Sequence, residues 1–268
     1  MLFVAGRGTG IMNANKLKLF AVVTMLIDHL GALGNTLMRY FSYGEDWIFY
    51  MTDDFFALRL IGRISFPLFA YLIAQGCIHT HSLSRYIRNL FAFAILSQLP
   101  YQFFTGMLYG YPNLFSYARG NVLFTLAFGA LAVWFHQQMV QRKQPLFFLG
   151  IALSFVAVVL FQAEYDISGV AIILCVYLLH REESAEGKSP VRQTYYKQAL
   201  ACSFIILIYY SAFFASVSQG LFASLCIFPL LFYNGQPGNR RAKWFFYSFY
   251  PVHFMILSGI LFFFLQTW

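Results

Sequence analysis

The stretch from Lys16 to Gly34 reads Lys-Leu-Lys-Leu-Phe-Ala-Val-Val-Thr-Met-Leu-Ile-Asp-His-Leu-Gly-Ala-Leu-Gly, an apolar run that carries two adjacent ionisable side chains, Asp28 and His29. The length of this run suits a helix that crosses a hydrocarbon core about 30 Å thick. A charge inside such a core is costly and is retained where it has a partner or a function. The Asp28-His29 pair therefore marks a candidate functional site within a membrane helix.

The composition indicates an integral membrane protein. Of the 268 residues, 60% are hydrophobic, 21% aromatic and only 10% charged, which leaves too few polar residues to cover a soluble surface. The sequence predicts an all-α, polytopic bundle of nine to ten transmembrane helices. It forms a single domain over residues 16–268, after a flexible lead-in over residues 1–15. The predicted spans lie at about 17–34, 58–78, 87–107, 121–140, 145–162, 167–180, 198–216, 218–233 and 245–266.

The basic residues are unevenly distributed among the connections between these spans. Fourteen of the 18 Lys and Arg residues fall in the N-terminal segment and in alternate connections, and the others are Arg39, Arg59, Arg63 and Arg119. Because cytoplasmic connections carry the excess of Lys and Arg, we expect a cytoplasmic N-terminus and, with nine spans, an external C-terminus in a bacterial inner membrane. The net charge of +8 thus reflects topology and gives no indication of nucleic-acid binding.

Cysteine and histidine spacing predicts no metal site. Cys77, Cys175, Cys202 and Cys226 lie in or beside apolar spans without a CxxC pair, so we expect them to act as small apolar side chains. The sequence His79-Thr80-His81 lies at the end of the second span with no carboxylate or cysteine nearby. We therefore interpret it as part of a solvated interface.

The polar residues within the spans are predicted to share one layer of the membrane. His29 lies about 20 Å above Lys16, given the 1.5 Å rise per helical residue. Arg63 lies near the outer entry of the second span, and His253 lies near mid-depth in the last span. Asp28, His29, Arg63 and His253 can therefore meet in the outer half of the bilayer.

Each of these side chains has a structural and a functional interpretation. Asp28 and Arg63 can form a structural ion pair, because intramembrane charges tend to pair. His253 can be a hydrogen-bonded packing residue or a base. His29 is the strongest candidate for a base, since a neighbouring carboxylate can orient an imidazole and make it more basic. Pro67 predicts a kink in the second span that can open a cavity.

Several segments together resemble the TraX family, whose named member acetylates the amino terminus of conjugative pilin. The resemblance runs from about residue 16 to the end, and its motifs in the first two spans are specific. The segments that carry it are 17–29, 60–70, 120–124, 165–169 and 243–253. The family is in turn similar to a larger group of membrane acyltransferases that use acyl-CoA.

The resemblance implies a membrane acetyltransferase, acting on an amine or a hydroxyl, that takes acetyl from cytoplasmic acetyl-CoA. The acceptor at the outer face is then a pilin-like amino terminus or an envelope glycan hydroxyl. His29 is implied as base or acyl acceptor, Asp28 as its orienting carboxylate, and Arg63 as the cation that stabilises an oxyanion or a donor phosphate. His253 joins these as a catalytic candidate. The candidate substrate-binding residues are Arg59, Asn121, Asp166, Tyr250 and Lys243.

Two other classes of protein remain open from the sequence. A transporter or proton-coupled carrier can use the same buried Asp, His and Arg side chains. The chain shows no convincing internal repeat and no matched pair of broken helices, which are typical of many carriers. A membrane scaffold, in which the buried charges only fix helix packing, is the third class.

The distribution of basic residues generates a topology prediction. A single cysteine introduced at position 188, in a background without the four native cysteines, should react with a membrane-impermeant reagent only after the cytoplasmic side is exposed. Cysteines at positions 45 and 113 should react in intact cells, because we expect both to be external. External labelling at position 188 would overturn the orientation and the assignment of the site to the outer half of the membrane.

Overall fold

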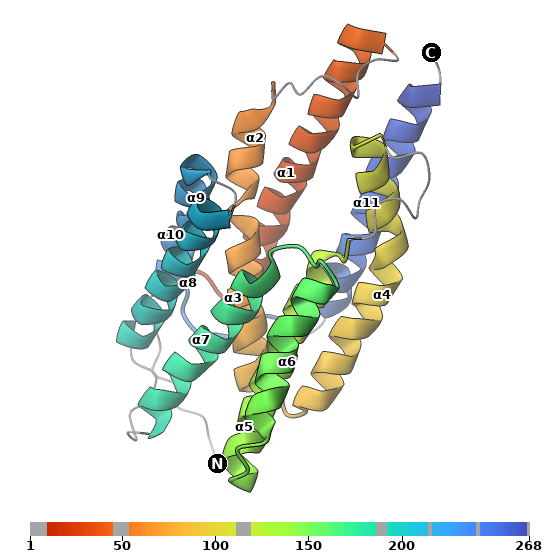
Figure 1. The fold of residues 1–268 in the computed structure, drawn as a ribbon. Helices are drawn as coiled ribbons and strands as arrows, with labels where there is room; N and C mark the ends of the chain where they lie inside the picture. The colour runs from red at the N-terminus through yellow and green to blue at the C-terminus, as the bar shows by residue number, and fades with distance from the viewer. Residues whose placement is uncertain are drawn as a thin grey trace.

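The structure, a computed structural model, describes residues 10–44, 54–110, 119–185, 192–213, 216–239 and 242–266. Over these residues the chain forms a helical bundle, with one isolated bridge between Met12 and Tyr233 (Figure 1). Residues 1–9 of the predicted lead-in lie outside the described part. Met12 is held in place, since its N–H donates to the Phe232 carbonyl (3.0 Å) and its carbonyl accepts from Asn234 (2.9 Å).

The helices follow the predicted apolar ranges. Their bounds are α1 Ala14–Tyr43, α2 Phe56–Gly62, α3 Ser65–His79, α4 Leu83–Leu108, α5 Val122–Arg142, α6 Phe147–Leu160, α7 Asp166–Ala185, α8 Arg192–Phe213, α9 Val217–Ser224, α10 Ile227–Leu231 and α11 Lys243–Gln266. Each predicted range corresponds to one helix or to a consecutive pair, α2 with α3 and α9 with α10. The described helices include five spans that are long and apolar enough to cross a membrane. The all-α membrane class is thus confirmed, whereas the number of crossings stays a prediction.

Proline explains the break between α2 and α3. Pro67 is the third residue of α3, and without an N–H it cannot donate to the carbonyl of Arg63 one turn earlier. The chain tightens before it, because Arg63 and Ile64 donate to carbonyls only three residues back, at 3.2 and 3.3 Å. The predicted kink is therefore confirmed, and it is a full interruption of the helix. Pro229 is likewise the third residue of α10 and follows the break after α9, which the sequence analysis had not identified.

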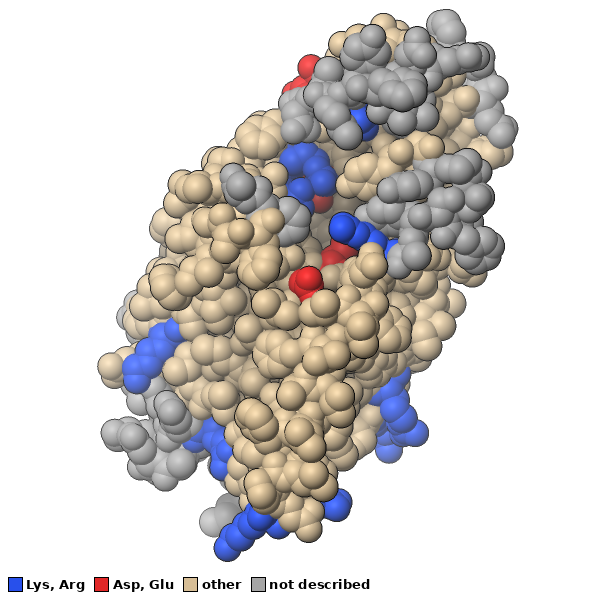
Figure 2. All heavy atoms as spheres, in the orientation of Figure 1, with Lys and Arg blue, Asp and Glu red and all other residues tan. Residues whose placement is uncertain are grey.

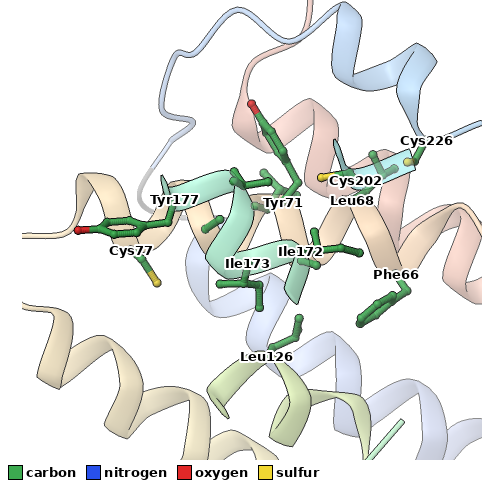
Figure 3. Close-up of a cluster of buried hydrophobic side chains, with 14 of the residues drawn as sticks. Phe66, Leu68, Tyr71, Cys77, Leu126, Ile172, Ile173, Tyr177, Cys202 and Cys226 are labelled. Carbon is green, nitrogen blue, oxygen red and sulfur yellow. The ribbon is translucent and has the colours of Figure 1, made fainter. Parts of the chain in front are cut away.

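Apolar side chains from α3, α5, α7 and α8 fill one part of the bundle (Figure 3). Leu68, Ile172, Ile173 and Cys202 have no exposed surface. All four cysteines are free, and Cys77, Cys202 and Cys226 are buried, as expected for small apolar side chains. The outer surface of the bundle is also apolar and exposes large side chains such as Ile95, Leu153, Phe204 and Met255. A surface of this kind suits contact with hydrocarbon and not with water.

The helices have unequal reach along the bundle, and this leaves room for a site. The ends of α5, α6 and α7 near residues 120 and 161–166 lie well below the upper ends of α1, α4 and α11 (Figure 1). Residues 162–166, in the connection between α6 and α7 and at the first residue of α7, line a cavity together with residues of α1 and α4.

Two glycines allow α1 and α2 to approach closely. A Cβ atom added at Gly62 would overlap the side chain of Asp28, and one added at Gly31 would lie 2.9 Å from the Cβ of Leu58. Small residues at a helix crossing are typical of membrane bundles. The contact places Asp28 directly against the backbone of α2.

This contact predicts that Gly62→Ala destabilises the protein. The added methyl group has to displace Asp28 or separate the two helices, and overpacking of this kind typically costs about 1–3 kcal/mol. We expect a lower melting temperature for the purified, detergent-solubilised variant. Gly259→Ala in α11 is the matched control, because a Cβ there meets nothing within 4 Å. Equal melting temperatures for the Gly62 variant and the wild type would contradict the close approach of α1 and α2.

Candidate active site

Two histidines from opposite ends of the sequence form a hydrogen bond between α1 and α11. The Nδ1 atom of His29 lies 2.9 Å from the Nε2 atom of His253, and Nδ1 of His253 lies 2.9 Å from the carbonyl oxygen of Phe249. A carbonyl only accepts, so Nδ1 of His253 carries a hydrogen and Nε2 of the neutral ring accepts. His29 then donates from Nδ1 and keeps the lone pair on its own Nε2. The chain of contacts thus selects the tautomer in which His29 can act as a base.

Asp28 forms its close ion pair with Arg59 in α2. Arg59 Nη1 donates to Asp28 Oδ2 at 2.7 Å and to the Asp28 backbone carbonyl at 3.2 Å. The Asp28–Arg63 pair considered from the sequence is longer, 3.9 Å from Nη2 to Oδ1. The resemblance implied that Asp28 orients His29. However, Asp28 Oδ2 lies 4.0 Å from His29 Nε2, and the hydrogen bond that orients His29 is the one that it donates to His253.

Arg63 lies where α2 is interrupted, and its contact with Asp28 is longer than that of Arg59. Its guanidinium group lies 3.9 Å from the Asp28 carboxylate and 6.0 Å from the ring centre of Tyr210 in α8. A cation on the wall of a cavity can stabilise negative charge that develops on a neighbouring ligand. The geometry therefore gives the two arginines different roles, Arg59 as the partner of Asp28 and Arg63 as a cation facing the cavity.

These side chains line a cavity of about 670 Å³. Figure 2 shows basic and acidic side chains gathered in a hollow on a face that is otherwise largely uncharged, with further basic side chains toward the other end of the molecule. Aromatic rings form much of the remaining lining. The ionisable and aromatic residues of the lining are Asp28, His29, Arg59, Phe66, Phe69, Arg63, Tyr101, Phe104, Tyr109, Arg119, Glu164, Tyr165, Asp166, Tyr209, Tyr210, Tyr250 and Phe254.

Most of the residues predicted from the sequence meet at this cavity. Asp28, His29, Arg59, Arg63, Asp166 and Tyr250 line it. His253 supports His29 from α11.

Two of the predicted binding residues are not among those lining the cavity. Asn121 is fully buried and caps α5, accepting from Leu123 N–H at 3.0 Å, while its amide donates to the Ala94 carbonyl and to the Gln98 side chain, both at 2.8 Å. Its polar atoms are therefore used to hold the α4–α5 contact. Lys243 begins α11, and its side chain lies outside the described residues.

Over the described residues, the cavity extends through only part of the bundle. On α1 its lining begins at Met25, and it includes neither Lys16 nor Lys18 near the predicted cytoplasmic end. The buried residues of the apolar core, among them Leu17 and Ala21 of α1, fill that end. The cavity lies beside the interruption before Pro67, where a cavity was predicted from the sequence.

Sequence reasoning did not identify Glu164 and Tyr101 as site residues. The Tyr101 hydroxyl donates to Glu164 Oε1 at 3.1 Å, and both residues line the cavity. The one signal for Glu164 in the sequence was its position, directly before the segment 165–169 that contributed to the family resemblance.

Comparison with known proteins agrees with the resemblance seen in the sequence. The family model described as "TraX protein" matches residues 13–261. The "Probable fimbrial assembly protein FimC, serogroup H1" of Dichelobacter nodosus is 28% identical over 258 residues, which cover 92% of this chain and 95% of that protein. No solved structure matches the chain. Because the family match extends from the cap of α1 to the last turns of α11, and so includes both histidines and both arginines of the cavity, this chain belongs to the TraX family.

Proposed function

We propose that this protein is a membrane acetyltransferase that moves acetyl from cytoplasmic acetyl-CoA to an acceptor at the outer face of a bacterial inner membrane. The observation that supports this most is the cavity in which the His29 lone pair and the Arg63 guanidinium are both presented. Acyl transfer needs a base for the acceptor's proton and a cation where negative charge develops on the carbonyl oxygen. The acceptor is a pilin-like amino terminus or an envelope glycan hydroxyl, and the name of the FimC relative as a probable fimbrial assembly protein favours the first.

His29 and Arg63 have separate roles in the proposed reaction. The acceptor nitrogen or oxygen attacks the thioester carbonyl, and His29 Nε2 takes the proton that the acceptor loses. The negative charge that forms on the carbonyl oxygen is stabilised by Arg63. When the carbon–sulfur bond breaks, the thiolate leaves and takes the proton from His29, which returns the imidazole to its neutral form.

The donor has to reach this cavity through the packed cytoplasmic end. The nine residue steps from Lys16 to Met25 correspond to about 14 Å of helix. An extended thioester arm has to cross this layer if the nucleotide part of acetyl-CoA remains at the cytoplasmic surface. The proposal therefore requires the core at the inner end of the bundle to open transiently between helices.

Binding of the donor can be tested without knowing the acceptor. A ligand that binds the folded state stabilises it by RT ln(1 + [L]/Kd), about 2.7 kcal/mol at a hundredfold excess over Kd. We expect acetyl-CoA and free CoA to raise the melting temperature of the purified protein, and ATP at the same concentration to raise it less. A folded protein that shows no shift at millimolar acetyl-CoA would favour the carrier instead.

The role of His29 is tested by transfer of radiolabelled acetyl from acetyl-CoA to envelope fractions. His29→Ala should lower the rate at least about 100-fold, the usual contribution of a general base, while acetyl-CoA still stabilises the variant. His253→Ala should lower the rate less, because it removes the hydrogen-bond acceptor that fixes the tautomer of His29 but leaves His29 in place. His81→Ala is the matched control, since His81 is exposed and far from the cavity lining. Near wild-type transfer by the His29 variant would exclude this mechanism.

A further inference from the structure

The structure places a second carboxylate on the cavity wall, in the connection between α6 and α7. Glu164 lies outside both helices and lines the cavity together with Asp28 and His29. Among the described residues, its carboxylate accepts one hydrogen bond, from the Tyr101 hydroxyl of α4 at 3.1 Å. The reaction proposed above makes no use of this residue.

The backbone around Glu164 is strained. Gln162, Tyr165 and Asp166 have φ values of 46°, 63° and 45°, in the left-handed region that residues other than glycine rarely adopt. Such conformations cost of order 1–3 kcal/mol each and persist where the surroundings impose them. A cluster of them beside a cavity points to a function for the side chain that the segment presents.

Contacts with the start of α5 impose this conformation. Gly120 N–H donates to the Phe161 carbonyl and Glu164 N–H donates to the Gly120 carbonyl, both at 3.1 Å. The Thr125 hydroxyl donates to the Glu164 carbonyl. The backbone of Glu164 is thus fixed on both sides, and its side chain is directed toward the cavity.

The two carboxylates of the cavity differ in their charge partners. Asp28 has Arg59 and Arg63 within 4.0 Å, whereas Glu164 has no Lys or Arg nitrogen within that distance among the described residues. Burial raises the pKa of Glu164 from its ordinary value of 4.5 to about 7, although the Tyr101 hydrogen bond and the two arginines lower it. A carboxyl group with this pKa exchanges protons near neutral pH.

Aromatic rings surround the same part of the cavity. The rings of Phe66 and Tyr165 stack with centres 3.6 Å apart, and the Tyr210 ring lies 6.3 Å from Tyr165. Tyr209 of α8 and Tyr250 of α11 complete the lining on this side. The faces of aromatic rings attract cations. A carboxylate beside such faces is suited to an ammonium group.

We propose that Glu164 is a second catalytic residue, which binds the acceptor as an ammonium ion and takes the first of the two protons that an amine must lose. This inference rests on the proposed acetyl transfer. One N–H bond of the ammonium breaks and its proton passes to the Glu164 carboxylate, which leaves a neutral amine. The amine nitrogen then bonds to the thioester carbon, and its second proton passes to His29 Nε2. The thiolate that leaves takes the proton from His29, and Glu164 releases its proton to water with the product.

The ammonium site can be tested without any acyl transfer. A protonated buried carboxyl group gives an infrared carbonyl band, which in the wild type should titrate with a midpoint near pH 7 and should be absent from Glu164→Gln. Asp54→Asn, which alters an exposed carboxylate, should keep the band. Propylammonium chloride should remove the band at pH 6.5, because it stabilises the ionised form, and propanol should not. A band that does not respond to propylammonium would overturn the proposal.

The melting temperature of Glu164→Gln tests whether the variant folds normally. The sign of its expected difference from the wild type follows from the raised pKa of Glu164. The pKa of Glu164 is raised in the folded state, so the ionised carboxylate destabilises the fold. This cost is absent below the ordinary pKa of 4.5 and is complete above about pH 7. The melting temperature of Glu164→Gln should therefore exceed that of the wild type at pH 8 and approach it at pH 5. A lower value for the variant at pH 8 would indicate a structural role instead.

The catalytic role is tested by the pH profile of acetyl transfer to a lysine-free peptide with a free amino terminus. In the wild type, kcat/KM should rise through about pH 7 as Glu164 ionises. In Glu164→Gln the rise should move to the pKa of the peptide amine, about 7.7–8.0, and the rate at pH 7 should fall about 100-fold. An unchanged profile would overturn the role of Glu164 while leaving the proposed function intact. If the wild type transfers no acetyl at all, the proposed function fails, and the infrared titration still decides whether Glu164 binds ammonium.

Discussion

The ion pair between Asp28 and Arg59 is the contact on which the arrangement of the cavity depends. Arg59 binds both the carboxylate and the backbone carbonyl of Asp28, so it fixes α2 against one turn of α1. The pair is partly buried, so removal of one partner would leave the charge of the other poorly compensated. Gly62 leaves the space on α2 that Asp28 occupies. His29 follows Asp28 in the same turn, so the position of the candidate base depends on the same contact.

The interruption of the second span gives its two arginines different surroundings. An uninterrupted helix would carry Arg59 and Arg63 on one face, four residues apart, with similar access to Asp28. Because Pro67 removes the hydrogen bond to the Arg63 carbonyl, the chain tightens at Arg63 and Ile64 before α3 begins. Arg59 is left in the close pair and Arg63 at 3.9 Å from the carboxylate. The interruption of the helix thus coincides with the difference between the short ion pair of Arg59 and the longer contact of Arg63.

Sequence reasoning could identify the helices and the layer of polar residues, because both depend on local patterns. Apolar runs of sufficient length predict helices in a membrane, and helical rise predicts that Asp28, His29 and His253 lie at similar depth. The pairing of charges could not be predicted in the same way. It depends on the rotation of α2 about its axis and on the close approach at Gly62, which are properties of packing. Asn121 shows the same limit, since its place in a family motif does not distinguish a helix cap from a ligand-binding amide.

Glu164 could not be predicted from the sequence as a site residue, and the reason is different. A single glutamate in a short connection normally lies in water at the membrane surface, so its sequence context does not indicate a buried site. The structure buries it because α5, α6 and α7 end below the other helices, so their connections form the floor of the cavity. Only the relative lengths of the assembled helices reveal this.

The two proposed acid–base groups, His29 and Glu164, are positioned by different parts of the structure. This has a consequence for the specificity toward the acceptor. His29 is positioned by side chains and backbone of α1 and α11, whereas Glu164 is positioned by a strained connection tied to the start of α5. Loops tolerate change better than packed helices and often carry substrate recognition. A substitution in residues 161–166 can therefore alter which acceptor is bound without moving the base that serves every acceptor. The same division of supports allows one helical framework to act on amines or on hydroxyls, because only an ammonium acceptor needs the second carboxylate.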